Sequence, residues 1–156
     1  MYSPPLAYFI TFTTYGTWLH GDERGSVERG GVHVDENNRR VFFEQSLMKH
    51  APVILTAAQR RIVDETVRRV AQYRGWRLDA LNVRTNHVHS VISGDDSGTK
   101  ILADLKSWST RELRQRGEFE TDAEIWTAGG SAIPRFTEEE WQESVYYVNE
   151  CQDKKR

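Results

Sequence analysis

Two amphipathic helical patterns, separated by a stretch rich in β-branched residues, constrain the fold of this chain more than any other feature. The first covers residues 57–74 and begins with a capping box, in which Thr56 is the N-cap and Gln59 the third helical residue. Gly75 follows it and suits the left-handed end of a helix. Residues of one packed face recur along it at helical spacing: Ile62, Val63, Thr66, Val67, Val70 and Ala71.

The second helical pattern covers about residues 99–116 and ends at Gly117. Its apolar face consists of Ile101, Leu102, Leu105, Trp108 and Leu113. Its polar face carries Lys106, Ser107, Arg111, Arg114 and Arg116, with fewer interleaved acids than the first helix. The arginines of the first helix alternate with Asp64 and Glu65, which is typical of a solvated network of salt bridges. The second helix is therefore the better candidate for a surface that faces phosphate.

Strand patterns surround these helices. They cover residues 8–15, 76–83 and 87–92, and shorter ones are expected at 52–55 and, as a hairpin around Gly129-Gly130, at 125–128 and 133–136. Residues 17–50 are expected to form a long loop with one short helix near 44–50. This order predicts an α+β sandwich, in which an antiparallel sheet carries both helices on one face.

Bulk properties favour a single domain over residues 1–156. The formal net charge is −2, so nucleic-acid binding requires a local basic surface or a metal-centred site. No apolar run approaches the roughly 20 residues that span a bilayer, and the N-terminal residues lack a signal-peptide pattern. A single cysteine, Cys151, is typical of a reducing compartment. We therefore expect a cytoplasmic protein without a membrane partner.

The candidate chemical site is Asn86-His87-Val88-His89. Alternate side chains of a strand share a face, so His87 and His89 point the same way while Val88 points the other way. Two imidazoles on one face can bind a divalent metal and leave coordination positions for a substrate. An exposed polar face of an edge strand can carry the same two histidines. The doublet alone therefore does not distinguish a metal site from a solvated strand face, and other parts of the sequence are needed.

A third helical pattern ends the chain. Thr137 and Glu140 form a second capping box, and Trp141, Val145 and Val148 form the packing face. We expect this helix to return across or beside the sheet face that carries the histidines. A tyrosine close to two metal-bound imidazoles can attack phosphorus, form a covalent phosphotyrosine and release a DNA 3′-OH. The reverse step can rejoin DNA, because the phosphotyrosine linkage keeps the energy of the broken phosphodiester bond.

Several stretches resemble the single-tyrosine HUH transposases, and within them the REP-associated tyrosine transposases. The most specific are Asn86-His87-Val88-His89 and the Lys-Ser-Trp-Ser-Thr-Arg-Glu-Leu segment at 106–113. Others follow in the same order along nearly the whole chain, at residues 8–19, 75–78, 126–131 and 145–148. The resemblance implies a ferredoxin-like antiparallel sheet with two helices on one face and a C-terminal helix that carries the tyrosine.

The resemblance also implies an activity. It points to a metal-dependent endonuclease and strand transferase that cleaves single-stranded DNA near hairpins, with Mg²⁺ or Mn²⁺ held by His87 and His89. We expect DNA contacts from Asn86, Lys106 and Arg111, and association with the nucleoid. Such proteins include monomers and dimers, so a homodimer is one of the two states that the resemblance allows. The resemblance also does not specify the DNA sequence that is recognised.

Tyr147 is the expected nucleophile, because Val145-Tyr146-Tyr147-Val148 matches the family order of aliphatic, variable, tyrosine and aliphatic residues. Tyr146, about 100° away on the helix, is the rival. The family's third ligand is an amide four residues after the tyrosine, where this chain has Cys151, and a thiolate suits zinc better than Mg²⁺ or Mn²⁺. We select Gln152, reaching in from a locally adjusted helix, with Glu150 or water as alternatives.

Two other functions compete with this one. A domesticated, non-catalytic module on the same fold would bind DNA or RNA hairpins through exposed aromatic residues such as Tyr8, Phe12 and Trp18. A hydrolase of small phosphoesters would need an enclosed pocket and more carboxylates near the histidines. Asp79 and Asp95 are the nearest in the sequence, and neither has a ligand spacing.

Overall fold

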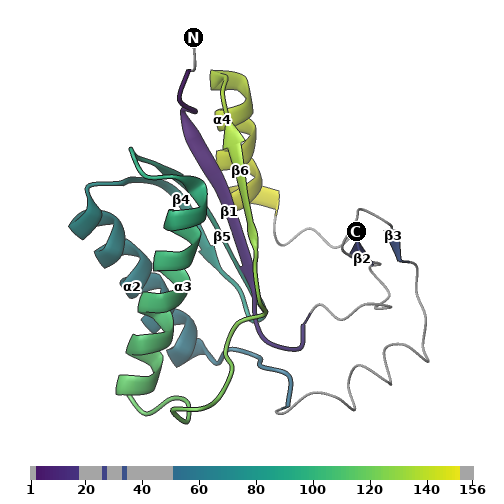
Figure 1. Cartoon of the computed structure of the whole chain (residues 1–156), viewed down its shortest axis with the longest axis vertical. Coiled ribbons are helices and arrows are strands. Elements are labelled where there is room, and N and C mark those ends of the chain that lie inside the picture. The colour runs from purple at the N-terminus through teal and green to yellow at the C-terminus, as the bar shows by residue number, and fades with distance from the viewer. Residues whose placement is uncertain (1–2, 18–25, 28–32, 35–50, 152–156) are drawn as a thin grey trace.

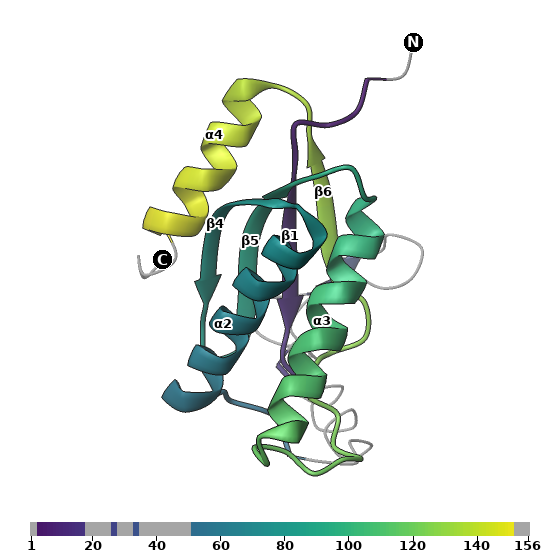
Figure 2. The ribbon, with the colours of Figure 1, turned by 90° about the vertical axis from the view of Figure 1, so that its left-hand side faces the viewer.

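The computed structural model describes residues 3–17, 26–27, 33–34 and 51–151. Its centre is a four-stranded antiparallel sheet in the order β4-β5-β1-β6. The strands are β1 (Ala7–Thr13), β4 (Arg77–Val83), β5 (His87–Ser93) and β6 (Ser131–Arg135). Helices α2 (Ala57–Arg74) and α3 (Gly98–Gln115) cover one face of the sheet (Figures 1 and 2). The order and layering confirm the predicted α+β, ferredoxin-like fold.

A third helix lies on the other face of the sheet (Figure 2). It consists of α4 (Glu138–Tyr146) and a π-helical continuation, η1 (Tyr147–Cys151). The capping box of Thr137 and Glu140 begins it, as the sequence predicts. The C-terminal helix therefore packs on the face that carries the histidines, and the prediction that it returns there is confirmed.

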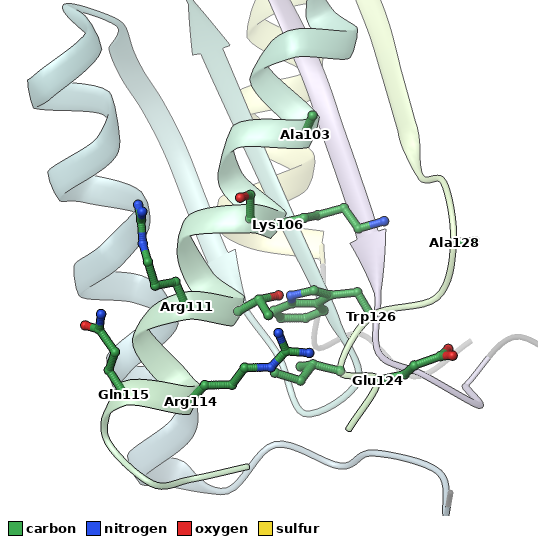
Figure 3. A pocket seen from close by; sticks show the side chains of 11 residues that line it. Ala103, Lys106, Arg111, Arg114, Gln115, Glu124, Trp126 and Ala128 are labelled. Atoms are coloured by element: carbon green, nitrogen blue, oxygen red, sulfur yellow. The ribbon is translucent and has the colours of Figure 1, made fainter. Parts of the chain in front are cut away.

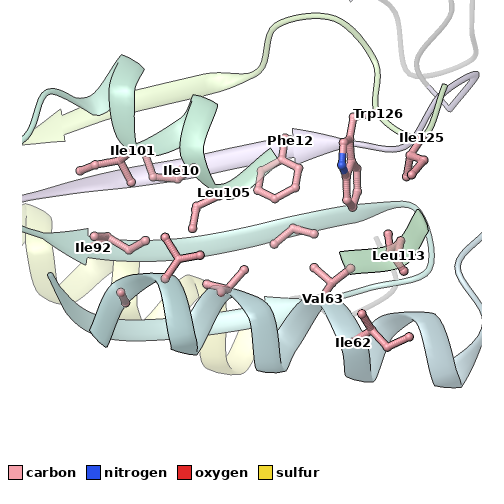
Figure 4. Close-up of a cluster of buried hydrophobic side chains, with 14 of the residues drawn as sticks. Ile10, Phe12, Ile62, Val63, Ile92, Ile101, Leu105, Leu113, Ile125 and Trp126 are labelled. Atoms are coloured by element: carbon pink, nitrogen blue, oxygen red, sulfur yellow. The ribbon is translucent and has the colours of Figure 1, made fainter. Parts of the chain in front are cut away.

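The main hydrophobic core lies between the sheet and α2 and α3 (Figure 4). The inward residues alternate along each strand, as in Ile10 and Phe12 of β1 and Val88 and Ile92 of β5. They meet Val63 and Val67 of α2 and, from α3, Ile101, Leu105 and Leu113. A smaller cluster on the opposite face consists of Ala7, Ala80, Val91 and Val148, with Phe9, Trp141 and Val145 partly buried beside it. Both faces of the sheet thus carry a hydrophobic cluster, and the cluster under α2 and α3 is the larger one.

The predicted hairpin at 125–136 is wrong. Residues 125–127 pair with the end of β1, through a bridge between Thr14 and Trp126, and β6 pairs with the body of β1. Both segments run in the same direction, so Gly129 (φ +80°) and Gly130 (φ +137°) form an irregularity along one edge of β1 rather than a reversal. A Cβ on Gly130 would lie 2.8 Å from the carbonyl oxygen of Thr11, so only glycine lets the chain pass this close.

Two smaller predictions also differ from the structure. Residues 52–55 form no strand, because the Val53 and Leu55 N–H groups donate to two separate places, the carbonyls of Tyr15 and Thr85. Residues 17–50, expected to form a long loop with one short helix, contain a short antiparallel pair, β2 (Ser26–Val27) and β3 (His33–Val34). The short helix expected near 44–50, and Trp18, lie outside the described residues. None of the helices described here is long and apolar enough to cross a membrane.

We expect Gly98→Ala to destabilise the fold, because Gly98 is where α3 touches β1 and β6. An added Cβ would lie 2.6 Å from Cδ1 of Tyr8 and 2.9 Å from Cβ of Ala132. Such overpacking typically lowers the free energy of unfolding by about 1–3 kcal/mol, which urea denaturation measures. Thr99→Ala, at the exposed neighbouring position, is the control and should change stability little. Equal stability of the two variants would contradict the close contact.

Candidate active site

The two histidines lie side by side on the sheet face opposite α2 and α3. The ring centroids of His87 and His89 are 4.5 Å apart, with the ring planes at 69°. Val88 between them is fully buried in the main core. The alternation predicted from the sequence is therefore confirmed, and both imidazoles can approach one ion.

Each imidazole is oriented by a hydrogen bond at Nδ1. Nδ1 of His87 lies 2.7 Å from Oδ1 of Asn86, and Nδ1 of His89 lies 2.8 Å from Oγ1 of Thr11. An amide oxygen only accepts, so Nδ1 of His87 donates to it. Oxygen partners at the second nitrogen are typical of metal-ligating histidines. Asn86 thus contacts a candidate ligand, while Thr11 is a residue that sequence reasoning missed, because it enters through the pairing of β1 with β5.

Neighbouring side chains partly enclose His89. Its ring stacks on the ring of Phe9, with centroids 5.5 Å apart and planes at 6°. Burial, and secondarily the charge of His87, lower the pKa of His89 from 6.5 to about 4. The imidazole is therefore neutral at physiological pH, which is the form that binds metal.

Tyr147 completes a cluster of rings with the histidines. Its ring meets that of His89 at 83° and that of Phe9 at 88°, and the centroids are 5.8 Å apart in both pairs. Its side chain is 39% exposed, so solvent and a ligand reach it. Tyr146 is 56% exposed and lines a different hollow, with Trp141 and Glu150. The structure therefore brings Tyr147 to the histidines, and it places Tyr146 and Glu150 on another flank of the helix.

Buried polar contacts hold the C-terminal helix in this position. Nε1 of Trp141 donates to the carboxylate of Asp79 at 3.0 Å, and Asp79 also accepts from Ser93 and from Arg77. The Arg77 guanidinium lies over the Trp141 ring, 5.6 Å from its centroid. Asp79 thus anchors α4 to the sheet and lies in no cluster with the histidines.

The helix changes its register at the tyrosine. α4 ends at Tyr146, and η1 begins with Tyr147. A π-turn makes hydrogen bonds between residues five apart, which alters the register of backbone donors and acceptors along the helix. The side-chain amide of Asn82 donates to the carbonyl of Val148 at 3.1 Å. Asn82 is directly opposite His89 in the sheet, so one strand pair supports both the ligand and the helix.

The third metal ligand expected from the sequence, Gln152, lies outside the described residues. Among the residues that the structure describes, no group of three His, Cys, Asp or Glu side chains could hold a metal ion. Two adjacent imidazoles with oxygen partners at Nδ1 fit two ligand positions of a divalent ion in their chemistry. A complete site needs a further ligand, such as an amide or water.

Lys106 and Arg111, the other expected DNA contacts, lie on α3 (Figure 3). This helix covers the sheet face opposite the histidines. The two side chains line a groove of about 770 Å³ between α3 and residues 124–128. Nζ of Lys106 donates to the carbonyls of Thr127 and Gly129, and burial lowers its pKa. The Arg111 guanidinium stacks over the Trp108 ring at 4.9 Å. The same groove contains Arg114, so α3 does present a basic surface.

The arginines of α2 behave as the charge pattern predicts. Arg68 pairs with Asp64 on its own helix, and Arg69 pairs with Glu112 of α3. Arg116, the residue directly after α3, joins the same network through Glu112. These ions are partly exposed, so each pair contributes little to stability.

A sequence model of the IS200-like transposases matches residues 37–155 of this chain. The chain belongs to this family. The match includes the histidines, α3 and the C-terminal helix, so it agrees with the resemblance found in the sequence. It assigns the chain to transposase-type proteins.

Two solved structures share the fold of this chain. One is a REP-associated tyrosine transposase bound to a REP hairpin, with a TM-score of 0.56 and 14% identity over 95% of this chain and 67% of that chain. The other is a protein from Deinococcus radiodurans R1, provisionally assigned as a transposase, with a TM-score of 0.50 and 16% identity over 95% of this chain and 92% of that one. No curated protein sequence matches the chain.

We expect the metal-free protein to lose stability between pH 6.5 and pH 4. In this window the unfolded chain protonates His89 and the folded protein does not, because its pKa is lowered to about 4. The unfolded state then binds more protons, so the free energy of unfolding falls as the pH falls. Urea denaturation at several pH values measures this slope. His89→Gln should decrease it, and an unchanged slope would contradict the burial of a neutral imidazole.

Proposed function

We propose that this protein is a metal-dependent endonuclease and strand transferase that cleaves single-stranded DNA near hairpins. The single observation that supports this best is the contact of Tyr147 with His89, at a ring separation of 5.8 Å. A nucleophile beside an oriented pair of imidazoles is the arrangement needed for metal-assisted attack on a phosphodiester. Membership of the IS200-like transposases supports the same reaction class.

In this proposal, Tyr147 forms the covalent bond to DNA. Its phenol loses a proton and Oη attacks phosphorus, which breaks the bond to the 3′ oxygen and releases a DNA 3′-OH. The product is a 5′-phosphotyrosine, and attack by a 3′-OH on that bond rejoins DNA and restores the tyrosine. The partial exposure of Tyr147 and its support by Phe9 suit a side chain that must meet a large substrate yet keep its position.

His87, His89 and Gln152 would hold Mg²⁺ or Mn²⁺. When bound, the metal polarises the scissile phosphate and offsets the charge that develops on its oxygens. Asn86 and Thr11 fix the orientation of the imidazoles, and the neutral form of His89 is the one required for binding. Gln152 is selected because it is five residues after Tyr147, and a π-turn such as η1 relates residues five apart. Glu150 is disfavoured by its position in the hollow beside Tyr146.

DNA would contact the protein on both faces of the sheet. Asn86, in the turn before β5, belongs to the histidine side, whereas Lys106 and Arg111 belong to the groove of α3. Lys106 keeps one N–H for a phosphate after donating to two carbonyls. Trp126 of the same groove pairs with Thr14, beside the Thr13–His87 pair, so the two surfaces meet at one end of the sheet. A hairpin and its flanking single strand can therefore be held together there.

We expect wild-type protein with Mn²⁺ to form a covalent adduct with hairpin-bearing single-stranded DNA. Tyr147→Phe should lower adduct formation by on the order of 10⁴-fold or more, because the attacking oxygen is removed. Denaturing gel electrophoresis of labelled DNA measures the adduct. Tyr146→Phe is the matched control and should leave the adduct intact. If Tyr146→Phe abolishes it and Tyr147→Phe does not, the assigned nucleophile is wrong.

Measuring metal binding distinguishes the proposed metal-dependent enzyme from a non-catalytic hairpin-binding module. Asn86→Ala removes the oxygen that orients His87 and should weaken Mn²⁺ binding by about 10- to 100-fold, while His87→Ala should weaken it further. Titration calorimetry with Mn²⁺ measures this directly. If wild-type protein binds hairpin DNA equally with and without Mn²⁺, forms no adduct, and His87→Ala changes neither property, the binding module is the better description.

A further inference from the structure

A hollow of about 350 Å³ opens beside Tyr147, between α4 and the edge strand β6, and the reaction proposed above leaves it without a role. It is lined by Phe9, Ile133, Arg135, Glu143, Ser144 and Tyr147. We propose that this hollow binds the nucleobase of a nucleotide adjoining the cleaved phosphodiester, and that it selects guanine. The inference rests on the proposed function and adds a source of sequence specificity to it.

The walls of the hollow suit the flat, apolar faces of a base. The rings of Phe9 and Tyr147 meet edge to face at 88°, and Ile133 stands opposite Phe9 in the pairing of β1 with β6. Ile133 is 43% exposed although it lies on the sheet face that α4 partly covers. Unstacked bases are commonly held between aromatic and apolar side chains in this way. Stacking accounts for affinity but not for the choice of base.

The polar rim of the hollow offers both donors and an acceptor. Nη2 of Arg135 lies 3.8 Å from Oε2 of Glu143, and Nε of Arg135 donates to the carbonyl of Glu140 at 3.3 Å. Glu143 is a loosely paired and largely exposed carboxylate. An arginine fork donates to the O6 and N7 acceptors of guanine, and a carboxylate accepts from amino and imino groups. Guanine presents O6 next to its N1–H and N2–H donors, so it matches an arginine beside a glutamate better than the other bases do.

The position of the hollow fits a nucleotide attached to the reacting phosphate. Tyr147 borders His89 on one side and the hollow on the other. A phosphate attacked by Tyr147 therefore has the metal-binding histidines on one side and the base hollow on the other. A base held in the hollow would fix the phosphate relative to the tyrosine oxygen, as positioning of a reacting group requires.

The test uses a pool of hairpin-bearing DNA with randomised single-stranded flanks, incubated with Mn²⁺ and the full-length protein. Covalently captured strands are sequenced together with the released strands. Wild type should enrich guanine about tenfold at one position adjoining the cleaved bond. Glu143→Gln removes the negative charge and exchanges one of the two accepting oxygens for an NH2 donor, so it should flatten that enrichment while adducts still form. Glu138→Gln, an exposed and isosteric change on the same helix, should retain it.

A second measurement does not depend on cleavage. Tyr147→Phe protein is mixed with hairpin DNA that carries, at the adjoining position, a fluorescent guanine analogue with the O6, N1–H and N2–H groups of guanine, and stacking in the hollow should quench its fluorescence. Adducts with no base preference next to the cleaved bond, or the same preference in Glu143→Gln, would overturn the subsite and leave the proposed function standing. Absence of adducts with every strand of the pool would instead overturn the proposed function, and the subsite with it.

Discussion

The candidate site depends on the docking of the C-terminal helix onto the histidine face of the sheet. The sheet presents small side chains there, Ala7 and Ala80, and the fully buried Val148 packs against them. This contact is apolar and small, so it specifies proximity better than orientation. The hydrogen bond from Trp141 to Asp79, a directional contact at a buried carboxylate, supplies the orientation. Without both contacts, Tyr147 would not be held against His89.

The π-turn at Tyr147 changes the helical register where the C-terminal helix contacts the histidine face of the sheet. A regular helix would continue the α-helical register through residue 151, whereas η1 changes it at the residue that touches the histidines. Asn82 bonds the carbonyl of Val148 within η1 and pairs with His89 across the sheet. Local departures of this kind are frequent at functional sites. The π-turn therefore coincides with the contact between the C-terminal helix and the histidine face.

The helices were predictable because their signals are local. The box of Thr56 and Gln59, the helical spacing after it and Gly75 set α2 without reference to the remainder of the chain. Pairing partners are not local, and here prediction failed: the hairpin around Gly129 and Gly130 is instead one edge of β1. The alternation of side chains along one strand is enough to place both histidines on the same face. Thr11, Phe9 and Asn82 come next to the histidines only through the pairing register of neighbouring strands. Sequence reasoning therefore selected His87, His89 and Tyr147 as candidates and missed Thr11, Phe9 and Asn82, which contact them across the sheet.

The two faces of the sheet differ in how completely they are covered, and the candidate site lies on the less covered face. The face under α2 and α3 carries the larger buried cluster, and its strand residues are close to fully enclosed. The other face is only partly covered, because α4 and η1 pack over Val91 and Ala80 and leave His87, His89 and Ile133 partly accessible. A partly covered face loses hydrophobic stabilisation but keeps side chains within reach of a large substrate. The rigid core beneath then supports those side chains from behind, since Val88 anchors the strand between the two histidines. Substitutions on the open face should consequently affect chemistry before they affect folding.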